Sequence, residues 1–433
     1  FSRVAAEGAL SVSFIPLYAK VQSEEGEEAA AAFSGNIFSL MILVLSGFTA
    51  LVLIGMPWII HVIAPGFADG TERYHLAVSM TRLTFPYLVL MSATALFGGM
   101  LNTHHKFAPF AAAPILFNLT LIVFVVILAR FFPTAGHAMA VGVTVSGVLQ
   151  MAMMIHFLRR YRIAFRIQRP RITAQTRQLF KAMGPGVLSA GVFQIHLFVN
   201  MMMASLLPSG AISHLYYADR LTQLPLGLAG VAVGTALLPL LSTALAARQH
   251  QESQDLFNRA LEFCFFIALP ATVALLVVPY PMVGILFERG QFSAQDTLQT
   301  SYVVMGYGIG LPAYIASKIF MTAFWAHHDT MTPVRISILT TLGNVAASLF
   351  LIGLCGVAGI ALATGLSGWA QVYLLHRALK RQDSLAFDDR LRHVVPKIAL
   401  CSCFMGIVLS ILSYELTSYF QQALPVKILA LLA

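Results

Sequence analysis

The stretch FSGNIFSLMILVLSGFTALVLIGMPWIIHVI, residues Phe33–Ile63, decides the fold class. It contains no Asp, Glu, Lys or Arg, and a helix needs roughly 20 apolar residues to cross a bilayer. A soluble helix of this length would carry charged residues along its outer face. A charge at the bilayer centre costs several kcal/mol, so its absence over such a length predicts a membrane-spanning helix.

The same pattern recurs along the whole chain. The uncharged stretches are too long for amphipathic soluble helices and lack the alternation of a β-barrel, so every span is predicted to be helical. Trimmed at turn signals, the predicted helices are Arg3–Val21, Phe33–Ile63, Leu76–Leu101, Phe107–Phe131, His137–Leu158, Met183–Leu206, Tyr216–Ala246, Leu256–Leu286, Thr297–Ala326, Thr332–Gly353, Gly356–Leu379 and His393–Ser418. The fold class predicted is an all-α polytopic membrane protein.

The composition agrees with this prediction. Of 433 residues, 58% are hydrophobic and 10% charged, whereas soluble domains have ~45–50% and ~25%. These proportions exclude a cytoplasmic enzyme, a secreted disulfide scaffold and a disordered chain. The four cysteines all lie in apolar runs, which is typical of small buried residues, so we expect no disulfide, metal site or other cofactor.

The net charge of +9 is interpreted as a topology signal, because the basic residues lie between the apolar runs, and no nucleic-acid partner is expected. The connection Arg159–Lys181 holds eight Lys or Arg and no acid, which predicts a cytoplasmic loop. Alternation then puts Gln382–Arg392 on the same side, and Ala64–His75 and Glu288–Asp296 outside.

The two halves of the chain repeat short motifs in the same order. Ile15-Pro16-Leu17 matches Leu238-Pro239-Leu240, His104-His105 matches His327-His328, and Ser146-Gly147 with Gln150 matches Ser367-Gly368 with Gln371. This spacing predicts two parallel six-helix repeats related by an axis along the membrane normal. The second repeat begins near Met183, so the first helix of the first repeat is expected to be missing from this chain.

The predicted organisation follows from the repeats and the loop. We expect an N-terminal lobe with five of its six helices at residues 1–158, a basic cytoplasmic inter-lobe loop at 159–182, a C-terminal lobe of six helices at 183–381, and extra C-terminal helices at 393–433, the last one truncated.

Charged residues within the helices are the candidate functional residues, because lipid makes them costly unless they face water or a partner. They are Arg3, Glu7, Arg82, Asp219, Arg220, Arg259, Glu262 and Lys318. Arg259 and Glu262 are three apart, a spacing that allows an ion pair. Arg82 and Lys318 lie deeper and have no opposite charge nearby in their own helices, which favours a water-filled cavity. Five of the eight are basic, which indicates an anionic ligand.

Enzyme signatures such as a nucleophile elbow, a phosphate loop or a zincin motif are lacking, and we expect a transporter. Several motifs together resemble the MurJ (MviN) lipid II flippase family of the MOP exporter superfamily. They are Ala6-Glu7-Gly8-Ala9-Leu10-Ser11 with Phe14-Ile15-Pro16, Ala64-Pro65-Gly66-Phe67, Thr84-Phe85-Pro86-Tyr87, Leu101-Asn102-Thr103, Tyr216-Tyr217-Ala218-Asp219-Arg220-Leu221 and Asp329-Thr330 with Thr332-Pro333-Val334.

The resemblance implies two six-helix lobes in a V, as in MATE-like exporters, and two extra helices that form a lipid-accessible groove. It implies that undecaprenyl-pyrophosphate-linked peptidoglycan precursor moves from the inner to the outer leaflet of the bacterial inner membrane by alternating access through a cationic central cavity. The partners it implies are lipid II or a related polyprenyl-pyrophosphate glycolipid and the membrane lipids, and a coupling ion is left open.

The family places arginines of its first, second and eighth helices around the pyrophosphate. In this chain the second-helix double Arg is Ser2-Arg3, and Glu262 stands where an eighth-helix Arg is expected, one turn after Arg259. The predicted substrate-binding residues are Arg3, Glu7, Arg82, Asp219, Arg220, Arg259 and Lys318, with no catalytic or metal-binding residue.

Two alternatives stay open. A cation-coupled exporter of drugs or metabolites, or of another polysaccharide-lipid, would need deep carboxylates, and Glu7, Asp219 and Glu262 lie nearer the predicted helix ends. A membrane enzyme such as a lipid glycosyltransferase is disfavoured because the loops are too short for a catalytic domain.

Overall fold

The computed structural model describes residues 11–67, 70–232, 237–247, 249–327, 329–381 and 387–415, and within these ranges all regular structure is helical. Nine helices in the described part of the chain are long and apolar enough to cross a membrane. The predicted all-α membrane fold is confirmed. The chain divides into an N-terminal unit, residues 1–198, and a C-terminal unit, residues 199–433. Each unit is described by itself.

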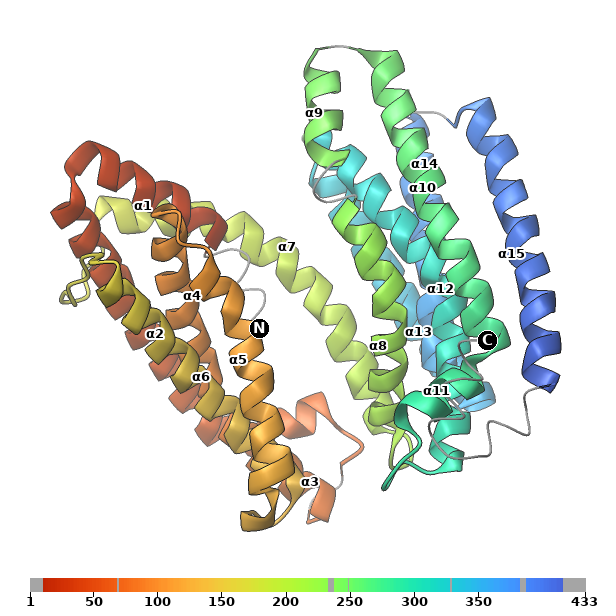
Figure 1. The fold of residues 1–433 in the computed structure, drawn as a ribbon, viewed down its shortest axis with the longest axis horizontal. Helices are drawn as coiled ribbons and strands as arrows, with labels where there is room; N and C mark the ends of the chain where they lie inside the picture. The colour runs from red at the N-terminus through yellow and green to blue at the C-terminus, as the bar shows by residue number, and fades with distance from the viewer. Residues whose placement is uncertain are drawn as a thin grey trace. The chain divides into compact units, whose positions relative to one another are not determined.

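The N-terminal unit contains seven labelled helices (Figure 1). They are α1 (Ser11–Glu25), α2 (Glu27–Ile63), α3 (Glu72–Thr84), α4 (Tyr87–Thr103), α5 (Ala108–Val123), α6 (Ala135–Arg160) and α7 (Ala174–Ser205), whose end continues into the C-terminal unit. The core lies between α1, α2 and α4, where the Phe14 and Phe33 rings stack 5.9 Å apart. Gly26 joins α1 to α2 with a φ of 88°, a value that glycine adopts without strain.

The C-terminal unit contains α8 (Ala211–Ala232), α9 (Leu238–Ala246), α10 (His250–Val277), α11 (Pro279–Phe287), α12 (Ala294–Ala326), α13 (Met331–Cys355), α14 (Val357–Arg381) and α15 (Asp389–Glu415). Helix α12 is central in this unit and lies among α8, α10 and α14 (Figure 1). Glycines let α12 approach α14 closely: a Cβ atom built on Gly306 would lie 2.8 Å from Ala361 Cβ.

Two predicted helices are interrupted in the structure. The predicted Leu76–Leu101 span breaks at Phe85–Pro86 into α3 and α4, and Leu256–Leu286 breaks at Val278 into α10 and α11. In both cases a proline removes a backbone donor at the break. The predicted Tyr216–Ala246 helix begins earlier, at Ala211, and its described parts are α8 and α9.

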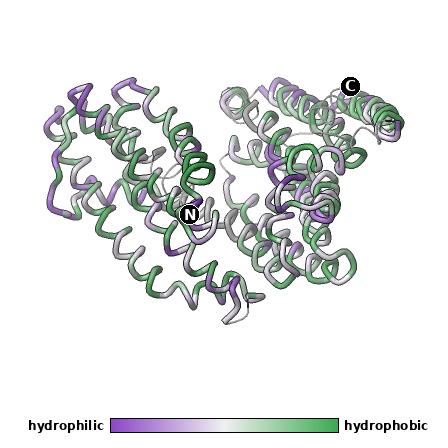
Figure 2. The backbone as a smooth tube through the Cα atoms, turned by 60° about the horizontal axis from the view of Figure 1, so that its bottom comes forward, coloured by the Kyte–Doolittle hydropathy of each residue, from purple (hydrophilic) through white to green (hydrophobic). Residues whose placement is uncertain are grey.

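The outer helices present apolar side chains to the surroundings. Leu51 on α2 is 71% exposed, Phe350 on α13 71% and Leu400 on α15 72%. Figure 2 shows that apolar segments run along the helices of both units. Water would penalise so much exposed apolar surface, whereas lipid would not, so these faces are the lipid-facing sides of the helices.

The segment between α6 and α7, residues 161–173, crosses α2 as a non-helical segment that we call the strap. Asn36 Nδ2 donates to the Arg171 carbonyl oxygen at 2.8 Å, and the Arg171 N–H donates to Asn36 Oδ1 at 2.7 Å. The Arg166 carbonyl oxygen lies so close to Gly35 that a Cβ atom there would collide with it. The strap is therefore packed against α2 within the N-terminal unit.

Candidate functional site

Arg82 lies at the C-terminal end of α3 with an exposed side chain. Its Nε donates to the carbonyl oxygen of Leu53 on α2 at 3.1 Å. Pro57 has no N–H, so this oxygen lacks the donor that the residue four positions later normally supplies. Arg82 replaces the missing donor. Within the described ranges no carboxylate pairs with Arg82, so its positive charge is not neutralised there.

Asp219 and Arg220 lie in the N-terminal half of α8. The Arg220 guanidinium stacks over the Tyr216 ring at 4.6 Å from the centroid and donates to the Tyr216 hydroxyl at 2.8 Å. Arg220 also donates to Gln223 Oε1 at 3.4 Å, while Gln223 Nε2 donates to the Asp219 carboxylate. Arg220 is thus oriented by neutral partners, and its exposed guanidinium remains available to an anion.

Lys318 is half-buried in the C-terminal third of α12. The buried thiol of Cys264 on α10 is a neighbouring titratable group. No ion pair with Lys318 is present in the described part of the chain. An ammonium group removed from water without a carboxylate is costly, so this side chain requires either water or an anionic ligand.

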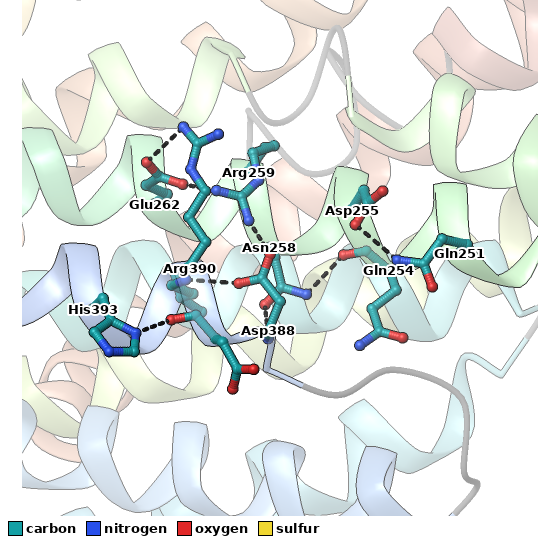
Figure 3. A network of polar contacts seen from close by, with 11 residues as sticks. Gln251, Gln254, Asp255, Asn258, Arg259, Glu262, Asp388, Arg390 and His393 are labelled. Atoms are coloured by element: carbon teal, nitrogen blue, oxygen red, sulfur yellow. Dashed lines mark hydrogen bonds and ion pairs between the residues drawn. The ribbon is translucent and has the colours of Figure 1, made fainter.

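Arg259 on α10 belongs to a charged network at the start of α15 (Figure 3). It forms ion pairs with Glu262 and with Asp388, and Arg390 Nη2 lies 3.2 Å from Glu262 Oε1. The pairing of Arg259 with Glu262 expected from their spacing is confirmed. The Arg259 side chain is 33% exposed and has two carboxylates as partners, so its charge is neutralised within the unit.

Asp388 has a second role in this network. Its Oδ1 accepts from the Leu391 N–H at 2.7 Å, which caps the first turn of α15. Its own N–H donates to Asn258 Oδ1 on α10 at 3.2 Å. The network therefore fastens the start of α15 to α10 and leaves Arg259 a structural part of that junction.

The structure brings together only part of the predicted set. It joins Arg259 to Asp388, the residue directly before α15, which the sequence did not indicate, and it places Asp219 and Arg220 around Gln223. Arg82 lies in the N-terminal unit and Lys318 in the C-terminal unit. Arg3 and Glu7 lie outside the described residues.

An apolar groove of about 320 Å³ lies between α10 and α15. Its lining residues are Phe266, Pro270, Val394, Lys397, Ile398, Cys401, Ser402 and Met405. Lys397 is the single charged residue in this lining, and the rest is mainly aliphatic or aromatic. The groove can hold a hydrocarbon chain better than a polar group.

Sequence reasoning missed the side chains that support proline kinks. Thr272 Oγ1 on α10 donates at 3.2 Å to the carbonyl oxygen of Gly308, the oxygen that Pro312 leaves without a helical donor. Pro57 has the same effect on α2. A proline inside a helix marks the carbonyl oxygen four residues earlier as one that needs another donor, and this signal is visible in the sequence. Asp388 could have been found separately, because an acidic residue directly before a helix is a typical N-cap.

Comparison with known proteins identifies the family. The family model described as "Lipid II flippase MurJ" matches residues 1–431. A Rhizobium meliloti protein named "Probable lipid II flippase MurJ" is 36% identical over all of this chain and 81% of its own length. A Burkholderia cenocepacia protein named "Lipid II flippase MurJ" is 32% identical over 88% of this chain and 74% of its own length.

Solved structures agree with this assignment. The structure titled "Lipid II flippase MurJ, inward closed conformation" is 25% identical, covers 100% of this chain and 88% of its own, and superposes with a TM-score of 0.79. An inward-facing MATE family multidrug resistance transporter of the MOP superfamily has a TM-score of 0.73 at 16% identity, over 88% of this chain and 87% of its own. That second likeness concerns the fold. The chain belongs to the lipid II flippase MurJ family, a family of multi-pass membrane transporters and not of enzymes.

Proposed function

We propose that this protein moves lipid II from the cytoplasmic to the outer leaflet of the bacterial inner membrane. Family membership over residues 1–431 and relatives that carry the flippase name over most of their own length support this proposal. The reaction makes and breaks no covalent bond. The protein's task is to lower the free-energy cost of passing a diphosphate and sugars through the hydrocarbon layer.

The observation that carries the proposal is that three basic side chains have no carboxylate partner in the described part of the chain. Arg82 lies on the candidate membrane span Glu72–Thr103, Lys318 on the span Ala294–Ala326 and Arg220 on α8, and none of the three has a carboxylate ion pair within the described ranges. Arginine can bind a phosphate oxygen pair in a bidentate manner, and lysine acts as a point charge. These three side chains are our candidates for contact with the pyrophosphate.

Arg259 differs from those three because Glu262 and Asp388 neutralise it. We therefore assign Arg259 to the α10–α15 junction and not to pyrophosphate contact. Arg3 and Glu7 remain candidates on sequence grounds, since a spacing of four residues puts them on one helix face.

The lipid tail has a separate path in this proposal. It stays in the bilayer, and the apolar groove between α10 and α15 is our candidate for its seat on the protein. The headgroup follows the cations while the two units alternate between inward-open and outward-open states. Asp219 is the candidate carboxylate for coupling to a cation gradient, because the side chain that donates a hydrogen bond to it, Gln223, is neutral.

The test uses bacteria depleted of their own lipid II flippase and carrying this protein. We expect that Arg82→Ala and Lys318→Ala each abolish growth rescue and the appearance of lipid II in the outer leaflet. Arg335→Ala, which removes an exposed cation near the start of α13, serves as the control and should support growth. Full transport by both Arg82→Ala and Lys318→Ala would contradict the cationic pathway.

The same cells distinguish a drug exporter on the same fold. Proton-dependent efflux of organic cations without any movement of lipid II would support the exporter and refute the flippase.

A further inference from the structure

We infer that the strap and the helix ends beside it, residues 159–181, form a binding surface for anionic phospholipid headgroups of the cytoplasmic leaflet. This inference does not rest on the proposed transport of lipid II. It rests on the charge of the segment, on how its backbone is anchored, and on its level along the membrane-spanning helices.

The first argument is charge. The segment carries eight basic side chains, and all eight are exposed; they are Arg159, Arg160, Arg162, Arg166, Arg169, Arg171, Arg177 and Lys181. It carries no acid, and the structure shows no ion pair to any of these eight within the ranges it describes. The protein therefore presents a concentrated positive surface that no described carboxylate compensates.

The second argument is the way in which the strap is held. Its anchors are backbone groups and apolar side chains: the Arg171 peptide pairs with Asn36, Ile163 is 9% exposed, and the Phe165 ring packs edge-on against Phe97 at 5.1 Å. None of these anchors uses a guanidinium group. The guanidinium groups therefore take no part in holding the strap, and they stay exposed while the backbone is fixed in position.

The third argument is depth. On α2 the strap crosses at Asn36, and the lipid-facing run of exposed side chains begins at Leu43, which is 61% exposed. Seven helical residues correspond to about 10 Å along the axis. The headgroup layer occupies roughly 5–8 Å on each side of the ~30 Å hydrocarbon core. The strap backbone thus lies near the outer, cytoplasmic edge of the headgroup layer.

The fourth argument is the mixture of residue types. Ile167 is 73% exposed and Ile172 is 68% exposed, and each has an arginine as its direct neighbour. Exposed aliphatic side chains among cations are typical of segments that lie in the interface, where apolar groups enter the acyl region and cations meet phosphates. A surface that binds a soluble polyanion has no need of such apolar groups.

The acidic residues nearby that the structure describes do not pair with the basic side chains of the strap. Glu27 begins α2 nine residues before Asn36, about 13 Å farther along the helix axis and away from the lipid-facing run. Glu25 accepts a hydrogen bond from Gln175 at 2.8 Å. Glu27 therefore lies on the cytoplasmic side of the strap, and Glu25 meets the proposed surface only at Gln175, outside the strap residues 161–173.

The experiment measures how many phosphatidylglycerol molecules the purified full chain retains from mixed micelles with phosphatidylcholine, by native mass spectrometry. The test variant is Arg166→Gln/Arg169→Gln/Arg171→Gln, which keeps every backbone anchor. The matched control is Arg377→Gln/Lys380→Gln/Arg381→Gln, which removes three exposed charges from the end of α14. A basic residue near an anionic surface changes affinity about fivefold, so the test variant should bind phosphatidylglycerol roughly 100-fold more weakly, and the control should retain it.

Three results would overturn the inference. The first is unchanged retention by the test variant. The second is an equal loss in test and control variants, which would show an effect of net charge alone. The third is displacement of phosphatidylglycerol by inorganic pyrophosphate at equal concentration, which would indicate a site for free anions.

Folding is controlled separately. Thermal unfolding in pure phosphatidylcholine micelles should not differ between the wild type and the test variant. If the triple variant unfolds there, Arg169→Gln/Arg177→Gln replaces it, since the side chains of these two residues contribute no anchor, and its expected loss is roughly 25-fold. Transport of lipid II is measured in parallel, because a chain that fails to transport can still bind phosphatidylglycerol at the strap.

Discussion

The Nε of Arg82 donates at 3.1 Å to the carbonyl oxygen of Leu53, the oxygen that Pro57 leaves without a helical donor. In the C-terminal unit an uncharged side chain has this role: Thr272 donates a hydrogen bond to the Gly308 carbonyl oxygen, which Pro312 leaves without a helical donor. Each kink is thus held by a side chain of another helix. In α2 the donor is also a candidate for substrate contact, so binding an anion would compete with holding the kink.

This relationship predicts an energetic coupling between Arg82 and Pro57. Arg82→Ala should destabilise the N-terminal unit by about 1 kcal/mol, because it leaves a polar oxygen without its donor. Pro57→Ala restores the N–H, so the same Arg82→Ala change should cost much less in that background. Thermal unfolding of the four proteins in detergent measures the cycle. Strictly additive effects would show that the two residues are not coupled.

The kink in α12 gives a prediction that is free of charge effects. Thr272→Val keeps the side-chain shape but removes the hydroxyl donor, and it should lower the free energy of unfolding by roughly 1 kcal/mol. Thr272→Ser retains the donor and should lose less. Pro312→Ala supplies the missing N–H and should suppress the Thr272→Val defect. A Thr272→Val protein as stable as the wild type would refute this role.

Substitutions at Asp388 separate helix capping from ion pairing. Asp388→Asn keeps an N-cap acceptor for the Leu391 N–H but loses the negative charge that pairs with Arg259. Asp388→Ala loses both. We expect both variants to be destabilised, with the alanine variant lower than the asparagine variant by about 1 kcal/mol. Equal stability of the two variants, measured by thermal unfolding, would mean that the cap contributes nothing.

The same network predicts a contrast in transport. Arg259→Gln should lower stability while each folded molecule still moves lipid II, because its guanidinium is already occupied by Glu262 and Asp388. Transport normalised to folded protein is the relevant quantity. A severe loss of normalised transport would place Arg259 among the substrate contacts after all.

Close helix packing gives a prediction with an internal control. Gly306→Ala forces a Cβ atom to within 3.0 Å of the Leu362 nitrogen on α14, and overpacking of this kind costs roughly 1–3 kcal/mol. Gly343→Ala on α13 meets nothing within 4 Å and should stabilise the helix by up to about 1 kcal/mol. A chemical unfolding series on both variants checks the opposite signs. A neutral Gly306→Ala would show that α12 and α14 can separate without cost.

The spans were predictable from sequence because hydropathy acts locally. The uncharged run within Phe33–Ile63 is enough to identify α2, and its C-terminal boundary agrees with the structure. The breaks within the predicted spans were harder to predict from the sequence. Pro279 follows Val278 directly, and with Pro281 it is the local signal for the end of α10, yet the uninterrupted hydropathy around them favoured one long helix.

The contacts of the candidate residues were beyond prediction where they join distant segments. The pairing of Arg259 with Glu262 follows from helical spacing, but its partner Asp388 lies 129 residues away. The partner of Arg82 is a backbone oxygen, which has no side-chain signature, and only the proline four residues later marks it. The backbone pairing of Arg171 with Asn36, 135 residues apart, likewise has no periodic pattern to reveal it.

The central claim is that unneutralised cations carry the pyrophosphate across, and transport by Lys318 variants tests it most directly. The measurement is the rate at which labelled lipid II crosses vesicles containing purified protein, with Arg335→Gln as the control for loss of one exposed charge. We predict at least a tenfold loss for Lys318→Gln, partial activity for Lys318→Arg, which keeps the charge, and a wild-type rate for the control. A wild-type rate for Lys318→Gln would contradict the account.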